Sequence, residues 1–319
     1  MPVVSIIVPN YNHAHFLKER LDSIFNQSYQ DFEVILLDDA SSDKSQEILS
    51  QYAKRPKVTQ YVVNKTNSGS PFKQWRKGIE LTKGKYIWIA ESDDVAELDF
   101  LRRLISRLEE DNDIGIAFCR SKIINNKGKA IGFSNSGDQF SHVRWSGDFV
   151  MDGVLAIKEH FRFSTHILNA SSVVVRKSAI KSPFYFQSYR YSGDWRYYLD
   201  ILMNHSISFT YEPLSIFRRS ESSHTWAKSS LISEWKRMSE RKKNLCLANN
   251  ISGLTIRDET DKYLWMCYSM LAHLNSKNYL WVLLSNCPIQ IKICLIRKAI
   301  YYCLDRIGLA HSAITSRPK

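Results

Sequence analysis

The fold of this 319-residue chain is decided by the stretch GKYIWIAESDD, residues 84–94. Tyr86 to Ala90 form a short apolar run, typical of a strand that is buried on both faces. Three carboxylates follow it within four residues: Glu91, Asp93 and Asp94. Because neighbouring carboxylates repel one another, they stay ionised at little cost only when solvated or bound to a cation. Two interpretations stay open, an acidic turn before a helix and a site for Mg²⁺ or Mn²⁺, which prefer carboxylate and phosphate oxygens.

Strand and helix patterns alternate on both sides of this stretch. Further strands are predicted at 3–8, 32–37, 58–63 and 114–118, and helices at 16–25, 42–52, 75–81 and 100–108. Such alternation favours an α/β fold with a mostly parallel central sheet flanked by helices, in which ligands bind at the carboxyl ends of the strands. Residues 120–165 are less regular, with a hairpin-like turn at 125–128. Strands are predicted again at 172–175 and 207–211. From about residue 231 a helical region is predicted, with one helix that includes Leu245 and Leu247 and two more at 263–274 and 291–304.

Composition narrows the class of protein without choosing a function. The chain has 44 Lys and Arg against 32 Asp and Glu, a net charge of +12. This charge is consistent with general solubility, or with attraction to nucleic acid, to anionic lipid headgroups or to phosphorylated substrates. None of the six cysteines forms a C-x-x-C pair, so we expect a reducing, cytoplasmic compartment. No signal peptide is visible, and no stretch reaches the roughly 20 apolar residues of a membrane span.

Polar residues follow other predicted strands. Asp38 and Asp39 come directly after the second strand, where a carboxylate can bind a base or ribose, or where Ser42 can cap a helix in an ordinary turn. Asp194 precedes an aromatic-rich helix and is either an N-cap or a general base. The segment Arg218–Thr225 suits phosphate or metal binding, or is a solvated loop.

Competing nucleotide signatures are absent from the sequence. The first strand is followed by Pro9-Asn10-Tyr11-Asn12-His13, not by G-x-G-x-x-G, which argues against a dinucleotide fold. Neither G-x-x-x-x-G-K-[ST] nor G-x-S-x-G occurs.

Three motifs in this order and spacing resemble those of the family-2 glycosyltransferases of bacterial polysaccharide and lipopolysaccharide synthesis, inverting enzymes with the GT-A fold. They are Val4–Asn12, Val34–Asp43 and Gly84–Asp94. The resemblance covers about the first 120 residues strongly and 165–225 more weakly. It implies a catalytic domain at 1–230, with a nucleotide-sugar-binding half (1–120) and an acceptor half (121–230), followed by a helical region at 231–319.

The resemblance also implies roles for single residues. Asp194 would be the catalytic base. The nucleotide site would consist of Pro9, Tyr11, Asp38, Asp39, Lys73, Arg76 and Ser92. The metal ligands would be Glu91, Asp93 and His224, with Asp94 supporting the metal or the sugar and Arg218 and Arg219 near the diphosphate.

Three positions depart from the family pattern. Glu91 replaces the first Asp of the D-x-D motif, which keeps the charge and shifts its oxygens. The Arg-Asn pair before the fourth strand is missing, so either Lys73 or Arg76 would contact the diphosphate. Gly193 stands where a Glu usually precedes the catalytic Asp.

The implied function is the transfer of a sugar from a nucleotide-diphosphate donor to a hydroxyl of a glycan or lipid-linked acceptor, with Mn²⁺ or Mg²⁺ as cofactor. UDP is favoured over dTDP. A nucleotidyltransferase and a catalytically degenerate binding protein are the alternatives; nucleic acid is not an expected partner, since clustered carboxylates repel phosphate backbones. The stretch 291–304 predicts either an interfacial helix on an anionic membrane, which would make the protein peripheral on the inner face of the cytoplasmic membrane, or a helix packed on the catalytic domain or in a homodimer.

Overall fold

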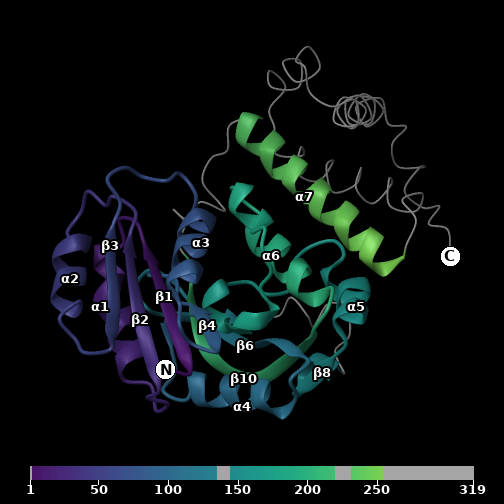
Figure 1. Ribbon diagram of the computed structural model, residues 1–319, viewed down its shortest axis with the longest axis horizontal. Coiled ribbons are helices and arrows are strands. Elements are labelled where there is room, and N and C mark those ends of the chain that lie inside the picture. Colours follow the sequence, from purple (N-terminus) through teal and green to yellow (C-terminus); the bar gives the residue numbers. More distant parts are fainter. Residues whose placement is uncertain (1, 135–143, 220–230, 254–319) are drawn as a thin grey trace, which may run out of the picture. The chain divides into compact units, whose positions relative to one another are not determined.

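The computed structural model describes residues 2–134, 144–219 and 231–253 (Figure 1). Two of the predicted C-terminal helices, 263–274 and 291–304, therefore lie outside the described residues, as does His224. The membrane and homodimer interpretations of the C-terminal region rest on the same residues and stay predictions.

One mixed sheet forms the centre of the fold. Its strands, in chain order, are β1 (Val4–Asn10), β2 (Phe32–Asp38), β3 (Val58–Val63), β4 (Tyr86–Ile89), β5 (Val95–Ala96), β6 (Ile114–Ile124), β7 (Ala130–Phe133), β8 (Phe149–Met151), β9 (Val173–Arg176) and β10 (Ser206–Arg218). The strand order is β3-β2-β1-β4-β9-β6-β10-β5, with β7 beside β6 and β8 beside β10. The first four strands are parallel, so the carboxyl ends of β1, β2 and β4 lie at one edge.

Helices cover both faces of the sheet (Figure 1). The helices of the described chain are α1 (Ala14–Phe25), α2 (Ser45–Tyr52), α3 (Pro71–Leu81), α4 (Phe100–Glu110), α5 (Gly153–Ala156), α6 (Gly193–Leu202) and α7 (Leu231–Ser252). Apolar residues of α1, α2 and α4 pack with alternate residues of β1, β2 and β4 in one buried core. On the opposite face α3 lies against β1, where a Cβ at Gly78 would meet Ile7 Cγ2 at 2.4 Å. Glycine at this position therefore allows α3 to approach the sheet closely.

The sequence prediction of a mostly parallel α/β sheet is confirmed, with three local differences. Strand β9 is inserted antiparallel between β4 and β6, which periodicity alone does not reveal. The short strands β5, β7 and β8 were not predicted, because two to four residues carry too little pattern. The predicted helix cap at Ser42 is wrong: α2 begins after Lys44, and the Ser42 backbone N–H donates to Asn12 Oδ1 at 2.8 Å.

The chain falls into two compact units, one of residues 1–227 with 243–253, and one to which the described residues 231–242 belong. The sheet and all residues discussed below lie in the first unit. No helix in the described part of the chain is both long and apolar enough to cross a membrane.

Candidate functional site

The loop after β1 is fastened to the loop after β2. Asn10 donates through Nδ2 to Asp38 Oδ2 (2.9 Å) and to Ser41 Oγ (3.1 Å). Asp38 is fully buried, and its other oxygen accepts from the Ser41 backbone N–H at 2.9 Å. Asn12 and Ala40 both have positive φ, 55° and 61°, so each loop contains one residue in a conformation that L-residues rarely adopt. Asp38 therefore shapes the two loops and presents no exposed oxygen to a ligand in this conformation.

Asp39 joins β2 to the segment before α3. Its Oδ1 accepts from Asn64 Nδ2 (2.6 Å), the Ser68 backbone N–H (2.9 Å) and Gln74 Nε2 (2.9 Å). The Ser68 hydroxyl donates to Oδ2 at 2.7 Å. Asp39 is 5% exposed, and its hydrogen bonds organise residues 64–74 around it.

The acidic turn, which we define as Glu91–Asp94, follows β4. The indole N–H of the buried Trp75 donates to Glu91 Oε1 at 2.7 Å, and the Glu91 backbone N–H donates to Ser171 Oγ at 3.0 Å. Burial is the main cause that raises the pKa of Glu91 to about 8, and the charge of Asp93 raises it further. Glu91 is thus held as a protonatable carboxyl between α3 and the segment that precedes β9.

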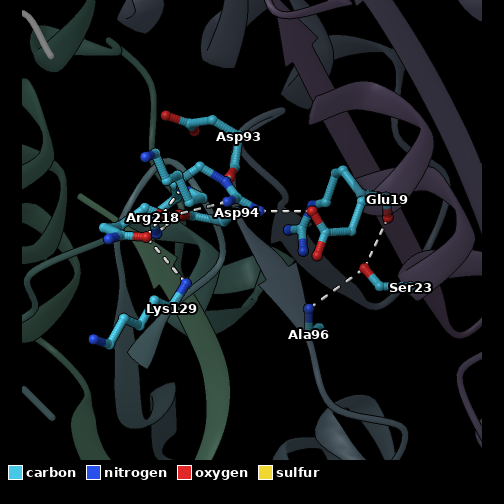
Figure 2. A network of polar contacts seen from close by, with 10 residues as sticks. Glu19, Ser23, Asp93, Asp94, Ala96, Lys129 and Arg218 are labelled. Atoms are coloured by element: carbon cyan, nitrogen blue, oxygen red, sulfur yellow. Dashed lines mark hydrogen bonds and ion pairs between the residues drawn. The ribbon is translucent and has the colours of Figure 1, made fainter. Parts of the chain in front are cut away.

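Asp93 and Asp94 differ in what they contact. Asp94 is 2% exposed and accepts from Asn169 Nδ2 (3.1 Å) and from the Arg218 backbone N–H (2.9 Å). Burial raises the pKa of Asp94 to about 6, with a smaller contribution from Asp93. Burial likewise raises the pKa of Asp93. The Asp93 carboxylate is half-buried and points away from the bonded network around Arg218 (Figure 2).

Arg218, at the end of β10, holds the acidic turn from the side. Its Nε donates to the Asp93 carbonyl at 2.9 Å, and its Nη2 donates to Glu19 Oε2 at 2.6 Å (Figure 2). Nη1 donates to the Asn125 carbonyl at 3.3 Å, and the guanidinium lies 4.7 Å from the centre of the Phe16 ring. All three guanidinium nitrogens are therefore engaged within the protein. This geometry favours a loop-holding role over the diphosphate contact that the sequence predicted.

Asp194 lies in the first turn of α6, and Ser192 is the N-cap, so the cap interpretation of Asp194 is wrong. Its Oδ1 accepts from the Trp195 backbone N–H at 2.8 Å. Burial, and then the charges of Asp194, Tyr197 and Glu91, raise the pKa of Tyr198. The Tyr197 ring of α6 lies 5.9 Å from the ring of Trp75, whose indole N–H donates to Glu91. Helix α6, which carries Asp194, is thus linked to the acidic turn through Trp75.

Glycine at 193 has a steric reason. A Cβ there would meet Phe72 Cδ2 at 2.6 Å and the Phe186 carbonyl oxygen at 2.8 Å. The departure from the usual Glu-Asp pair is therefore a consequence of packing between α3 and α6.

The other predicted residues are spread around the same edge. Pro9 is buried at the end of β1, and Tyr11 is 42% exposed beside it. Ser92 is buried, and its hydroxyl lies 2.8 Å from His13 Nδ1. Lys73 is exposed, and its ammonium donates to the carbonyl of Ser68, the residue that also bonds Asp39.

Two basic residues contact the protein elsewhere. Arg76 donates from Nε to Glu80, on its own helix, at 2.8 Å. Arg219 is exposed, and its backbone N–H donates to the Ile124 carbonyl.

Sequence reasoning missed Arg20, Trp75 and Asn169, three residues that surround the acidic turn. Arg20 lies on the buried face of α1, and Trp75 on that of α3. The helical pattern places both residues on the core-facing side of their helices. Of the two, only Arg20 gives a signal that could be recognised in the sequence, because arginine is rarely buried. Asn169 precedes a strand in the region where the family resemblance is weak.

The donor set fits a divalent cation that shares its ligands with a substrate. No group of three or more His, Cys, Asp or Glu side chains converges on a metal position among the described residues. Asp93 is the one carboxylate of the acidic turn that does not accept from a described side chain. Mg²⁺ typically binds through one or two carboxylates together with phosphate oxygens and waters, so Asp93 with a diphosphate is a suitable set.

Comparison with known proteins agrees with this geometry. The model of the family "Glycosyl transferase family 2" matches residues 5–226. An uncharacterized glycosyltransferase of Methanocaldococcus jannaschii is 26% identical over 205 residues, 64% of this chain and 66% of that protein. A poly(ribitol-phosphate) beta-glucosyltransferase of Bacillus spizizenii is 35% identical over 127 residues, 39% of this chain and 20% of that protein. The matched region thus spans less than two thirds of these relatives.

A solved structure has a similar fold. It is that of residues 1–349 of S. aureus TarS in complex with UDP, at 17% identity and a TM-score of 0.61. The match covers 88% of this chain and 78% of that one.

Proposed function

The chain belongs to glycosyl transferase family 2, and we propose that it transfers a sugar, with inversion, from a UDP-sugar to a hydroxyl of a glycan or lipid-linked acceptor. The observation that carries this proposal is the half-buried carboxylate of Asp93, just after β4, which accepts from no described side chain. Two features support it: Asp39 follows β2 at the same edge of the sheet, and α6, with Asp194 in its first turn, contacts α3 through the rings of Tyr197 and Trp75.

The residues proposed to bind the base suit a pyrimidine nucleotide. Tyr11 offers an exposed ring just after β1, and Asp39 follows β2 at the same edge of the sheet, where the Ser68 hydroxyl donates to it. A dTDP-sugar has nearly the same recognition groups and is the second candidate donor. Support for UDP also comes from the TarS structure, which contains it.

Asp194 is the proposed general base. It would take the proton from the acceptor hydroxyl as the oxygen attacks the anomeric carbon from the face opposite the diphosphate. A divalent cation, when bound, supplies charge neutralisation for the nucleotide diphosphate that leaves. Asp93 would hold that cation, while Asn169 and Arg218 keep the acidic turn in place through Asp94.

The acceptor class is proposed from the relatives. Two of them act, by name, on or toward cell-surface polymers, the poly(ribitol-phosphate) enzyme and a teichuronic acid biosynthesis enzyme of Bacillus subtilis. A role in surface polysaccharide synthesis would suit the net charge of +12 if the acceptor is anionic.

Calorimetric titration tests this proposal directly. UDP, dTDP and GDP are each titrated with and without Mn²⁺ into the wild type, Asp93→Ala and Glu47→Ala, the last an exposed carboxylate on α2 as a control. We expect UDP to bind only with Mn²⁺, and binding to be lost in Asp93→Ala alone. Failure of the folded wild type to bind any nucleotide would favour a degenerate, non-catalytic protein.

A further inference from the structure

Among the residues of α1, Arg20 is the only one that is both charged and buried. It is 0% exposed, and none of its three guanidinium nitrogens has a hydrogen-bond partner among the described residues. The guanidinium carbon lies 4.6 Å from the centre of the Trp88 ring, so the cation stacks on an aromatic face. Arg218, the other buried arginine beside the acidic turn, differs because its nitrogens all donate hydrogen bonds.

Arg20 lies near the acidic turn, because Trp88, on which it stacks, is in β4, the strand that leads into the turn. Burial lowers the pKa of Arg20 to about 10, and the charges of Asp94, Asp93 and Glu91 act against that shift. The side chain therefore carries its charge at neutral pH. A buried cation without hydrogen bonds is unfavourable unless nearby charges compensate, and an apolar side chain of similar size fills such a site at lower cost. The three carboxylates are consequently the reason that an arginine is tolerated here.

We propose that Arg20 is a positioning residue, a fixed counter-charge beneath the acidic turn that weakens divalent-cation binding until a nucleotide diphosphate is present. The inference rests on the proposed function, because it concerns the cation that Asp93 would share with the donor. A fixed positive charge repels a cation that arrives alone. A diphosphate brings negative charges that outweigh this repulsion, so cation and nucleotide bind together.

The test compares Arg20→Met, which removes the charge and keeps most of the volume, with Arg20→Lys, which keeps the charge. Binding of Mn²⁺ without nucleotide is followed by the electron paramagnetic resonance signal of free Mn²⁺, and then repeated with saturating UDP. We expect Arg20→Met to bind Mn²⁺ alone at least about tenfold more tightly than the wild type, since a repulsive charge has been removed. Arg20→Lys should stay close to the wild type, and the enhancement of Mn²⁺ binding by UDP should shrink only in Arg20→Met.

A purely structural role predicts the opposite sign. A collapsed or shifted turn would weaken Mn²⁺ binding with and without UDP. Weaker or unchanged Mn²⁺ binding by folded Arg20→Met would therefore overturn the inference. If Arg20→Met does not fold, Arg20→Gln takes its place. If neither neutral variant folds while Arg20→Lys does, the charge serves folding and the inference is wrong. Failure of the wild type itself to bind UDP with Mn²⁺ would instead refute the proposed function.

Discussion

Glu91→Gln gives the most direct measure of the electrostatics in the acidic turn. The pKa of Glu91 is raised from 4.5 to about 8, first by burial and then by Asp93, while the Trp75 hydrogen bond and Arg20 act in the opposite direction. The folded protein therefore holds this proton more tightly than the unfolded chain between pH 4.5 and pH 8. Wild-type stability must fall as the pH rises through that range, and the glutamine variant lacks this loss.

The magnitude follows from the size of the shift. Each pH unit within the window changes the free energy of unfolding by about 1.4 kcal/mol, which sets an upper limit of about 5 kcal/mol between pH 4.5 and pH 8. Because part of the Glu91 side chain is exposed, solvent screening reduces this, and we expect roughly 2–3 kcal/mol. The assay is urea denaturation of both proteins at pH 5, 6, 7, 8 and 9 in EDTA, with the difference in the free energy of unfolding plotted against pH.

We expect the free energy of unfolding of Glu91→Gln, relative to that of the wild type, to rise from pH 5 to pH 8 and to stay constant above pH 8. Glu47→Gln, on an exposed face of α2, controls for the change of carboxylate to amide and should give a difference that does not vary with pH. A pH-independent difference for Glu91→Gln as well would refute the reasoning, because it would mean that the folded protein does not raise the pKa of this carboxyl.

Four further outcomes are expected. Asp194→Asn should bind UDP and Mn²⁺ within about threefold of the wild type and lose about 10²–10⁴-fold in turnover with a UDP-sugar, as for a lost general base; near-normal turnover would remove the residue from the chemistry. Gly193→Ala should lower the free energy of unfolding by about 1–3 kcal/mol, because its Cβ would lie 2.6 Å from a ring carbon and 2.8 Å from a carbonyl oxygen; unchanged stability in urea would contradict the close packing. Ala40→Gly should raise the free energy of unfolding by roughly 0.5–1 kcal/mol, since φ is 61° and glycine relieves the strain at some cost in chain entropy. A lower free energy of unfolding in the same assay would argue against strain at this residue. Asn169→Ala should lower the free energy of unfolding by about 1–3 kcal/mol, because the buried carboxylate of Asp94 loses a donor. Calorimetry should also show weaker binding of UDP with Mn²⁺, and an unchanged affinity would count against a role of Asn169 at the site.

The fold of the first 120 residues could be predicted almost completely from the sequence. Strands β1, β2 and β4 are mostly apolar runs that are buried along their length, and the parallel order follows from the alternation of strands with helices. The position of Asp39 and the acidic turn at one edge follows from the same topology. Strand β9 could not be placed, because pairing between β4 and β6 brings together residues about 60 or more apart in the chain, and periodicity carries no information on such partners.

The sequence indicates which residues lie near the site better than it indicates what each of them does there. A carboxylate after a strand predicts a polar site, but the sequence does not say which oxygens are already bonded within the protein. Asp38 is closed off by Asn10 and Ser41, whereas Asp93 is not bonded in this way. From its residue type, Arg218 was predicted to contact phosphate. Its partners in the structure, Glu19 and the Asp93 carbonyl, indicate that it holds the acidic turn in place instead.

The contacts of the acidic turn link two distant parts of the chain. The turn follows β4, yet Asp94 is bonded by Asn169 and Arg218, which both lie beyond residue 120. Asn169 also accepts from the Ser121 hydroxyl at 2.9 Å, near the carboxyl end of β6. A shift of β6 or β10 would therefore change the donors around Asp94 without changing the bonds of Asp39. Because buried carboxylates depend strongly on each donor, we expect the segment beyond residue 120, which is proposed to hold the acceptor, to affect the proposed cation and diphosphate site at Asp93.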